Sequence, residues 1–87
     1  MINKKRINIA VVGLGYVGLP LAVEFGKIVN TVGYDFNKVR VKELLKGNDT
    51  TLEVNKSDLK ISKKLKVNNF LKEIMSANIY IVTVPTP

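Results

Sequence analysis

Three glycines at fixed spacing are the residues of this chain best suited to bind a ligand. Gly13, Gly15 and Gly18 form the pattern Gly-x-Gly-x-x-Gly, which lies between an apolar, β-branched run and a stretch with helical spacing. Gly13 allows a tight turn out of a strand, Gly15 allows the main chain to approach a pyrophosphate, and Gly18 allows a helix to pack closely on the strand. In this context the pattern predicts a dinucleotide-binding turn more strongly than a plain structural turn.

Backbone donors and one acid complete the predicted site. Tyr16 and Val17 lie where the helix should begin, so their N–H groups have no helical partner and can hold phosphates, helped by the helix dipole. Asp35 ends the next apolar run, about 20 positions after Gly13, where such a unit carries the acid that binds a ribose. A carboxylate there accepts hydrogen bonds from both ribose hydroxyls and repels a 2′-phosphate, which favours NAD over NADP.

Each side chain near the predicted ribose-binding site has an alternative role. Asp35 could simply form an Asx turn at the end of its strand. Lys38 and Arg40 are close enough to reach the adenosine end, and we expect them to flank the ribose or to face solvent. Thr86 stands between two prolines that hold it rigidly extended, so its hydroxyl is a candidate cofactor contact, or it is only a rigid loop residue.

The elements needed to position these residues alternate between strand and helix. We expect strands at 7–12, 31–34, 65–67 and 79–84, and helices at 16–28, 37–46, 56–63 and 69–75, with a loop at 48–55. The first helix should pack through an apolar face made of Val17, Leu21, Ala22, Phe25 and Ile28. Asn37 and Asn69 should cap the helices that follow them, and Leu45 should share the apolar face of the second helix.

This order of elements predicts an α/β fold. Right-handed crossovers give a Rossmann-type parallel sheet, part of a doubly wound domain, with strand order 3-2-1-4. The reversal beside the first strand places a crevice at the carboxyl ends of the first and fourth strands. Both the glycine turn and the stretch around Thr86 should meet there.

Composition excludes several kinds of chemistry. The 87 residues contain no Cys and no His, so they cannot provide thiol or imidazole catalysis, a disulfide or an ordinary zinc site. The net charge of +7 raises nucleic-acid binding as a third hypothesis, one that predicts a steep salt dependence. The lysines, however, crowd polar segments without aromatic residues for base stacking, and we expect solvated faces and no nucleic-acid partner.

The N-terminus superficially resembles a signal peptide or a short membrane span. Residues 1–6 are basic, and no charge occurs from Ile7 to Val23. The three glycines, Pro20 and Asn8 are poor choices for an inserted helix, and the run is at the lower limit of spanning length. We therefore expect no membrane partner and a cytoplasmic location.

Taken together, residues 9–22, Gly33-Tyr34-Asp35 and residues 81–87 resemble the N-terminal NAD-binding domain of the UDP-glucose and GDP-mannose dehydrogenase family. Residues 23–27 and 48–54 are most similar to the bacterial branch that acts on UDP-N-acetylhexosamines for polysaccharide synthesis. The resemblance implies oxidation of a sugar C6 alcohol to a carboxylate with two NAD, through a thioester on a cysteine. It also implies that Val17, Asp35, Arg40 and Thr86 contact NAD.

The resemblance further implies that the catalytic groups lie outside this sequence. We expect residues 1–87 to be the N-terminal part of the cofactor domain, without its second half, a central helix or a sugar domain, and to be inactive alone. The fourth strand would then be an uncovered edge, at which self-association is expected. The alternative is a stand-alone regulatory module that binds NAD or another adenine nucleotide without catalysis.

Overall fold

A four-stranded parallel sheet organises the chain. The computed structural model describes residues 6–83. The strands are β1 (Asn8–Val12), β2 (Asn30–Tyr34), β3 (Leu65–Asn68) and β4 (Ile79–Val82), in the order β3-β2-β1-β4. Both the predicted α/β class and the predicted strand order are confirmed.

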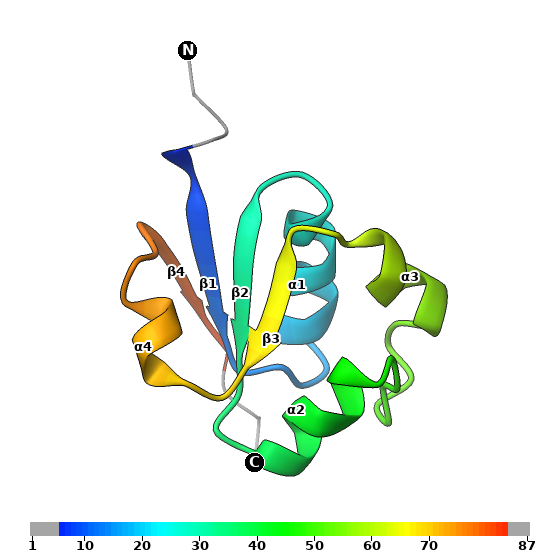
Figure 1. The fold of residues 1–87 in the computed structure, drawn as a ribbon. Coiled ribbons are helices and arrows are strands. Elements are labelled where there is room, and N and C mark those ends of the chain that lie inside the picture. Colours follow the sequence, from blue (N-terminus) through cyan, green and yellow to red (C-terminus); the bar gives the residue numbers. More distant parts are fainter. Residues whose placement is uncertain (1–5, 84–87) are drawn as a thin grey trace.

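Four helices connect the strands. They are α1 (Gly18–Gly26), α2 (Lys38–Leu45), α3 (Lys56–Ile61) and α4 (Leu71–Ile74). Figure 1 shows α1 and α4 on opposite sides of the sheet, as right-handed crossovers require when the strand order reverses. Within the described residues, no helix is both long and apolar enough to cross a membrane.

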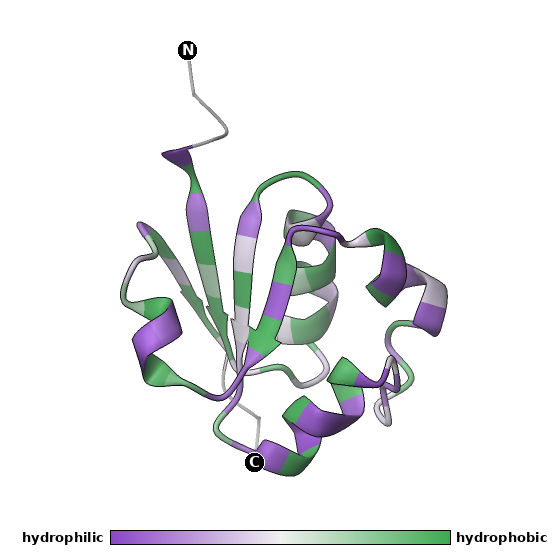
Figure 2. Ribbon diagram, viewed as in Figure 1, coloured by the Kyte–Doolittle hydropathy of each residue, from purple (hydrophilic) through white to green (hydrophobic). Residues whose placement is uncertain are grey.

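The hydrophobic core lies mainly between β1 and α1. Helix α1 is largely hydrophobic, whereas α2, α3 and α4 carry many hydrophilic residues (Figure 2). The buried cluster consists of Ile9, Val11, Leu14, Leu19, Ala22, Val23, Val29 and Leu44. Leu14, from the glycine turn, is fully buried in this core, so the turn is anchored by its own side chain.

The apolar face predicted for α1 is wrong in part. Val17 and Ile28 lie outside the helix and are 64% and 53% exposed. The residues buried on α1 are Gly18, Leu19, Ala22, Val23 and Gly26. The glycine at each end lets the helix approach its neighbours so closely that no side chain fits at those positions. The spacing of apolar side chains gives no sign of such contacts. Leu45 of α2, also predicted to be apolar and buried, is 66% exposed.

Of the two predicted helix caps, Asn37 is confirmed and Asn69 is not. Asn37 caps α2 as expected, because its Oδ1 accepts hydrogen bonds from the N–H groups of Val39 at 3.0 Å and Arg40 at 3.3 Å. The cap predicted at Asn69 is wrong. Helix α4 begins after Phe70, and Oδ1 of Asn68 instead accepts from the Phe70 N–H at 3.2 Å in a local turn.

Substitution of Gly26 by alanine tests how closely α1 must approach the sheet. A Cβ at Gly26 would lie 2.6 Å from the Cβ of Leu65 and against the hydroxyl of Ser62. We expect Gly26→Ala to lower the free energy of unfolding by about 1–3 kcal/mol through overpacking. Urea unfolding followed by circular dichroism measures this change.

Gly15→Ala is the matched control, because a Cβ at Gly15 meets no atom within 4 Å. It should leave stability nearly unchanged. Equal stability of the two variants would contradict the close packing described for α1.

Candidate functional site

The carboxyl ends of β1, β2 and β4 converge on the glycine turn. The N–H of Gly13 donates to the carbonyl of Tyr34 at 2.8 Å, which fixes the start of the turn to β2. On the other side, the N–H of Thr83 donates to the carbonyl of Val12 at 2.8 Å. The turn therefore lies at the strand reversal, where open α/β sheets bind ligands.

The three glycines occupy different environments. Gly13 has φ +98°, and a Cβ there would lie 2.8 Å from Oγ1 of Thr83. A Cβ on Gly18 would meet the Gly13 carbonyl and lie 2.6 Å from the same Thr83 oxygen. The structural roles predicted for Gly13 and Gly18 are thus confirmed. Gly15 faces open space, which leaves room for a ligand to approach its backbone.

Donors for an anion are available where α1 begins. Tyr16 and Val17 are 68% and 64% exposed, and no side chain caps the helix. Among the described residues, neither N–H has a hydrogen-bond acceptor. Unpaired N–H groups at the positive end of a helix suit a phosphate, so the residues present fit the predicted role.

Asp35 forms an Asx turn, the role expected as an alternative to ribose binding. Its carboxylate can still accept hydrogen bonds from a ligand. Its Oδ1 accepts from the N–H of Asn37 at 2.9 Å, and its Oδ2 accepts from the N–H of Leu14 at 3.0 Å. A carboxylate offers about four lone-pair sites, so each oxygen can accept a further hydrogen bond. The Asx turn and ribose binding are therefore compatible.

Of the two positions expected for Arg40, beside the ribose or in solvent, the structure excludes the second. The residue is only 9% exposed. Its Nε donates to the carbonyl of Leu14 at 2.8 Å, and its Nη1 donates to Oδ1 of Asp49 at 2.8 Å. Two guanidinium N–H groups remain beyond these bonds and a long 3.5 Å contact to Thr51, so a cofactor contact by Arg40 stays a prediction.

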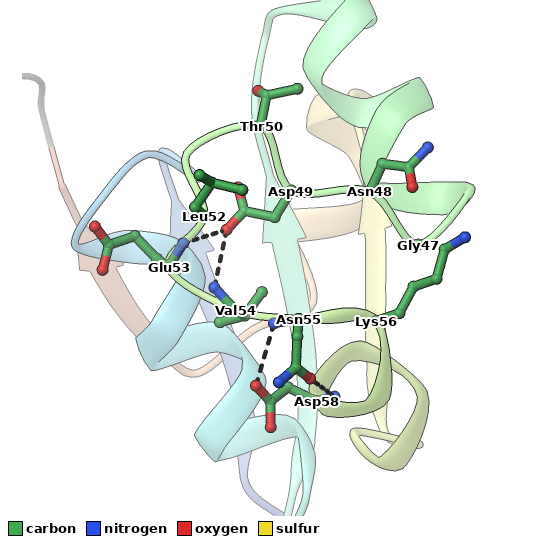
Figure 3. A pocket seen from close by; sticks show the side chains of 10 residues that line it. All are labelled: Gly47, Asn48, Asp49, Thr50, Leu52, Glu53, Val54, Asn55, Lys56 and Asp58. Carbon is green, nitrogen blue, oxygen red and sulfur yellow. Dashed lines mark hydrogen bonds between the residues drawn. The ribbon is translucent and has the colours of Figure 1, made fainter.

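Asp49 organises the loop at 48–55 and was missed by the sequence analysis. Its side chain is fully buried, and it accepts a hydrogen bond from the Thr51 hydroxyl at 2.6 Å. It also accepts from the N–H groups of Glu53 and Val54 at 2.9 and 3.0 Å (Figure 3). Burial by itself would raise the pKa of Asp49, but the bonds from Thr51, Val54 and Arg40 outweigh it and lower the pKa to about 2. An Asp two positions before a Thr is a turn signal that could have indicated this role.

A second residue overlooked in the sequence is Thr83. Its hydroxyl donates to the carbonyl of Gly13 at 2.8 Å and so braces the turn from β4. Thr86, the predicted cofactor contact in the same segment, lies outside the described residues. Within residues 6–83, no three His, Cys, Asp or Glu side chains are grouped to hold a metal.

A hollow of the surface lies away from the glycine turn. It has a volume of about 700 Å³ and lies between the end of α2 and the start of α3 (Figure 3). Its lining runs from Gly47 to Asp58 and includes Asp49 and the exposed Leu52. None of the glycine-turn residues lines it.

Fold and site together define a Rossmann-type dinucleotide-binding domain. Residues 7–87 match the UDP-glucose/GDP-mannose dehydrogenase family, NAD binding domain. The chain belongs to this family, whose cofactor is NAD.

Individual relatives agree with this assignment. Over 83 residues the chain is 53% identical to UDP-N-acetyl-D-glucosamine 6-dehydrogenase of Pseudomonas aeruginosa, covering 95% of this chain and 20% of that enzyme. It is 48% identical to the Salmonella typhi enzyme of the same name, covering 100% of this chain and 20% of the relative. The solved structure of a UDP-D-ManNAc dehydrogenase from Pyrococcus horikoshii superposes with a TM-score of 0.86 at 35% identity, covering 93% of this chain and 21% of that one. The chain thus spans about a fifth of these relatives.

The lowered pKa of Asp49 predicts a loss of stability in acid. The unfolded carboxyl group, with an ordinary pKa of 3.8, takes up a proton more readily than the folded one at about 2. The stabilisation is therefore complete above about pH 5 and is lost towards pH 2, and it amounts to about 2 kcal/mol.

Urea unfolding of the wild type and Asp49→Asn between pH 6 and pH 2 measures this term. The difference in unfolding free energy between the two should shrink as the pH falls. A difference that does not change with pH would contradict the hydrogen-bond network drawn around Asp49.

Proposed function

We propose that residues 1–87 are the N-terminal, NAD-binding part of a nucleotide-sugar 6-dehydrogenase. The parent enzyme would oxidise the C6 alcohol of a UDP-N-acetylhexosamine, or of a UDP-hexose, to the uronic acid with two NAD. The names of the relatives in Pseudomonas aeruginosa and Salmonella typhi support this substrate class. We assign no catalytic residue to this chain and expect it to be inactive alone. A cytoplasmic location is part of the same proposal.

One observation carries the binding role. Gly15 faces open space at the start of a helix whose first exposed N–H groups lack acceptors among the described residues. A Cβ at Gly15 would meet no atom within 4 Å, so a pyrophosphate can approach this backbone, and the helix dipole favours its charge. Bound there, NAD would supply the hydride acceptor of the reaction.

Each predicted residue has a defined task in this proposal. Tyr16 and Val17 donate their N–H groups to the pyrophosphate, and Asp35 accepts hydrogen bonds from the adenosine ribose. The glycines shape the turn. The cofactor-binding residues are Gly13, Gly15, Tyr16, Val17, Gly18, Asp35, Arg40 and Thr86. The comparisons do not favour the stand-alone regulatory module, because these relatives are named as dehydrogenases.

Calorimetric titration of the chain with NAD and NADP tests the proposal. We expect saturable binding of NAD and weaker binding of NADP, because the Asp35 carboxylate repels a 2′-phosphate. Asp35→Ala should weaken NAD binding about tenfold or more through loss of charged hydrogen bonds, and it should narrow the preference for NAD.

The variant Gly15→Ala tests whether the pyrophosphate binds beside Gly15. It should fold normally but bind NAD more weakly, because its methyl group occupies the open space beside the turn. The proposed site would be contradicted if the folded wild-type chain showed no detectable NAD binding. It would also be contradicted if Gly15→Ala bound NAD as well as the wild type.

We also propose that the chain self-associates through β4. This strand is at the edge of the described sheet, and its residues Ile79, Tyr80 and Val82 are 44%, 50% and 66% exposed. An uncovered apolar edge strand is a template for pairing with another chain.

Sedimentation velocity over a range of concentrations measures this association. Val82→Lys should shift the chain towards monomer, since charged side chains block edge pairing. Val39→Lys, at a position on α2 that is 65% exposed, adds the same charge elsewhere and should have no effect. If the wild type stays monomeric at every concentration, self-association of the chain is excluded.

A further inference from the structure

The backbone on both sides of Leu14 is held by charged side chains. Its N–H donates to Asp35, and its carbonyl accepts from Nε of Arg40 at 2.8 Å. A trans peptide group is planar, with its C=O and N–H pointing in opposite directions. Because the Leu14 carbonyl points to Arg40, the N–H of Gly15 must point away from Arg40. The position of Arg40 therefore sets the direction of the peptide group that enters the open part of the turn.

Arg40 is in turn held by the 48–55 loop. Its Nη1 donates to Oδ1 of Asp49 at 2.8 Å, and side-chain exposure in this pair is 10% for Arg40 and 0% for Asp49. Asp49 cannot shift easily, because backbone N–H groups and the Thr51 hydroxyl hold both of its oxygens. We refer to Leu14, Arg40 and Asp49, with these two bonds, as the arginine clamp.

A buried ion pair is weak evidence for a purely stabilising role, because desolvation of both charges offsets their attraction. The arginine clamp has a geometric consequence that apolar packing could not supply. It connects a loop 35 residues further along the chain to the peptide group before Gly15, where an added Cβ would meet no atom within 4 Å. Glycines are conformationally permissive, so the Arg40 bond to the Leu14 carbonyl adds a restraint on the Leu14–Gly15 peptide group that the buried Leu14 side chain does not supply.

We propose that Asp49 is a positioning residue for the dinucleotide, acting through Arg40 to orient the Leu14–Gly15 peptide group towards the pyrophosphate. This inference rests on the proposed function of the glycine turn. The Asp49 side chain is fully buried, so in this role it acts without contacting the ligand. Thr51 supports the same role, because its hydroxyl fixes the Asp49 oxygen that Arg40 contacts.

A double-mutant cycle on NAD affinity tests the arginine clamp. We expect Asp49→Asn and Arg40→Lys each to weaken NAD binding about tenfold, because both release the Leu14 carbonyl. Asp49→Asn should add little once Arg40→Lys is present, since Asp49 acts only through Arg40. Thr51→Val should weaken binding in the same direction but less, and it decides the question if Asp49→Asn does not fold.

Asp58→Asn is the matched control. Asp58 lines the same hollow and accepts a backbone hydrogen bond from Asn55 at 3.2 Å, but it has no bond to Arg40. It should leave NAD affinity unchanged even if it lowers stability. In NMR spectra without NAD, Asp49→Asn should shift the amide signal of Gly15, and Asp58→Asn should not.

The possible failures can be told apart. If the wild type does not bind NAD, the proposed function fails and the clamp role fails with it. If the wild type binds and folded Asp49→Asn or Thr51→Val binds equally well, only the positioning role is overturned. Additive effects of Asp49→Asn and Arg40→Lys would likewise overturn it, because they would mean that Asp49 acts independently of Arg40.

Discussion

The binding turn depends on a steric constraint at the point where β1, α1 and β4 meet. The Gly13 carbonyl, the backbone of Gly18 and the hydroxyl of Thr83 lie so close together that neither glycine could carry a side chain there. This contact holds the start of α1 over the end of β1 and brings β4 against the same turn. The start of the helix, where the N–H groups of Tyr16 and Val17 have no acceptor among the described residues, consequently lies at the carboxyl ends of β1 and β4, where the strand order reverses. The start of the helix is therefore positioned by close packing that requires glycine at both positions.

Charge is used differently at the site and on the rest of the surface. Asp35, Arg40 and Asp49 are each bonded to other parts of the protein and determine local backbone geometry. Every lysine of the described residues is exposed, so much of the net charge of +7 lies in solvent. Such a distribution affects solubility more than recognition. The basic composition of the chain therefore says little about its ligand.

The sequence was sufficient to predict features that depend on local chemistry or on general rules of chain topology. The strand order follows from right-handed crossovers, and the cap at Asn37 follows from a short polar side chain before an apolar periodic segment. The orientation of α1 was not predictable from apolar spacing, because its closest contacts are made by Gly18 and Gly26. The turn that Asp49 forms with Thr51 has a local signal, but its pairing with Arg40 could not be predicted, since Arg40 is itself held by the Leu14 carbonyl, 26 residues away in sequence.

The pairing of β1 with β4 has a consequence for how the chain folds. Ile9 pairs with Ile79, so this ladder closes almost the whole described chain, whereas β1 and β2 close a much shorter loop. Closing a longer loop costs more chain entropy, and contacts between distant residues slow folding. Thr83 can brace the glycine turn only after that closure. A nucleotide that binds the completed turn would therefore stabilise the closed chain by mass action and slow the opening of β4.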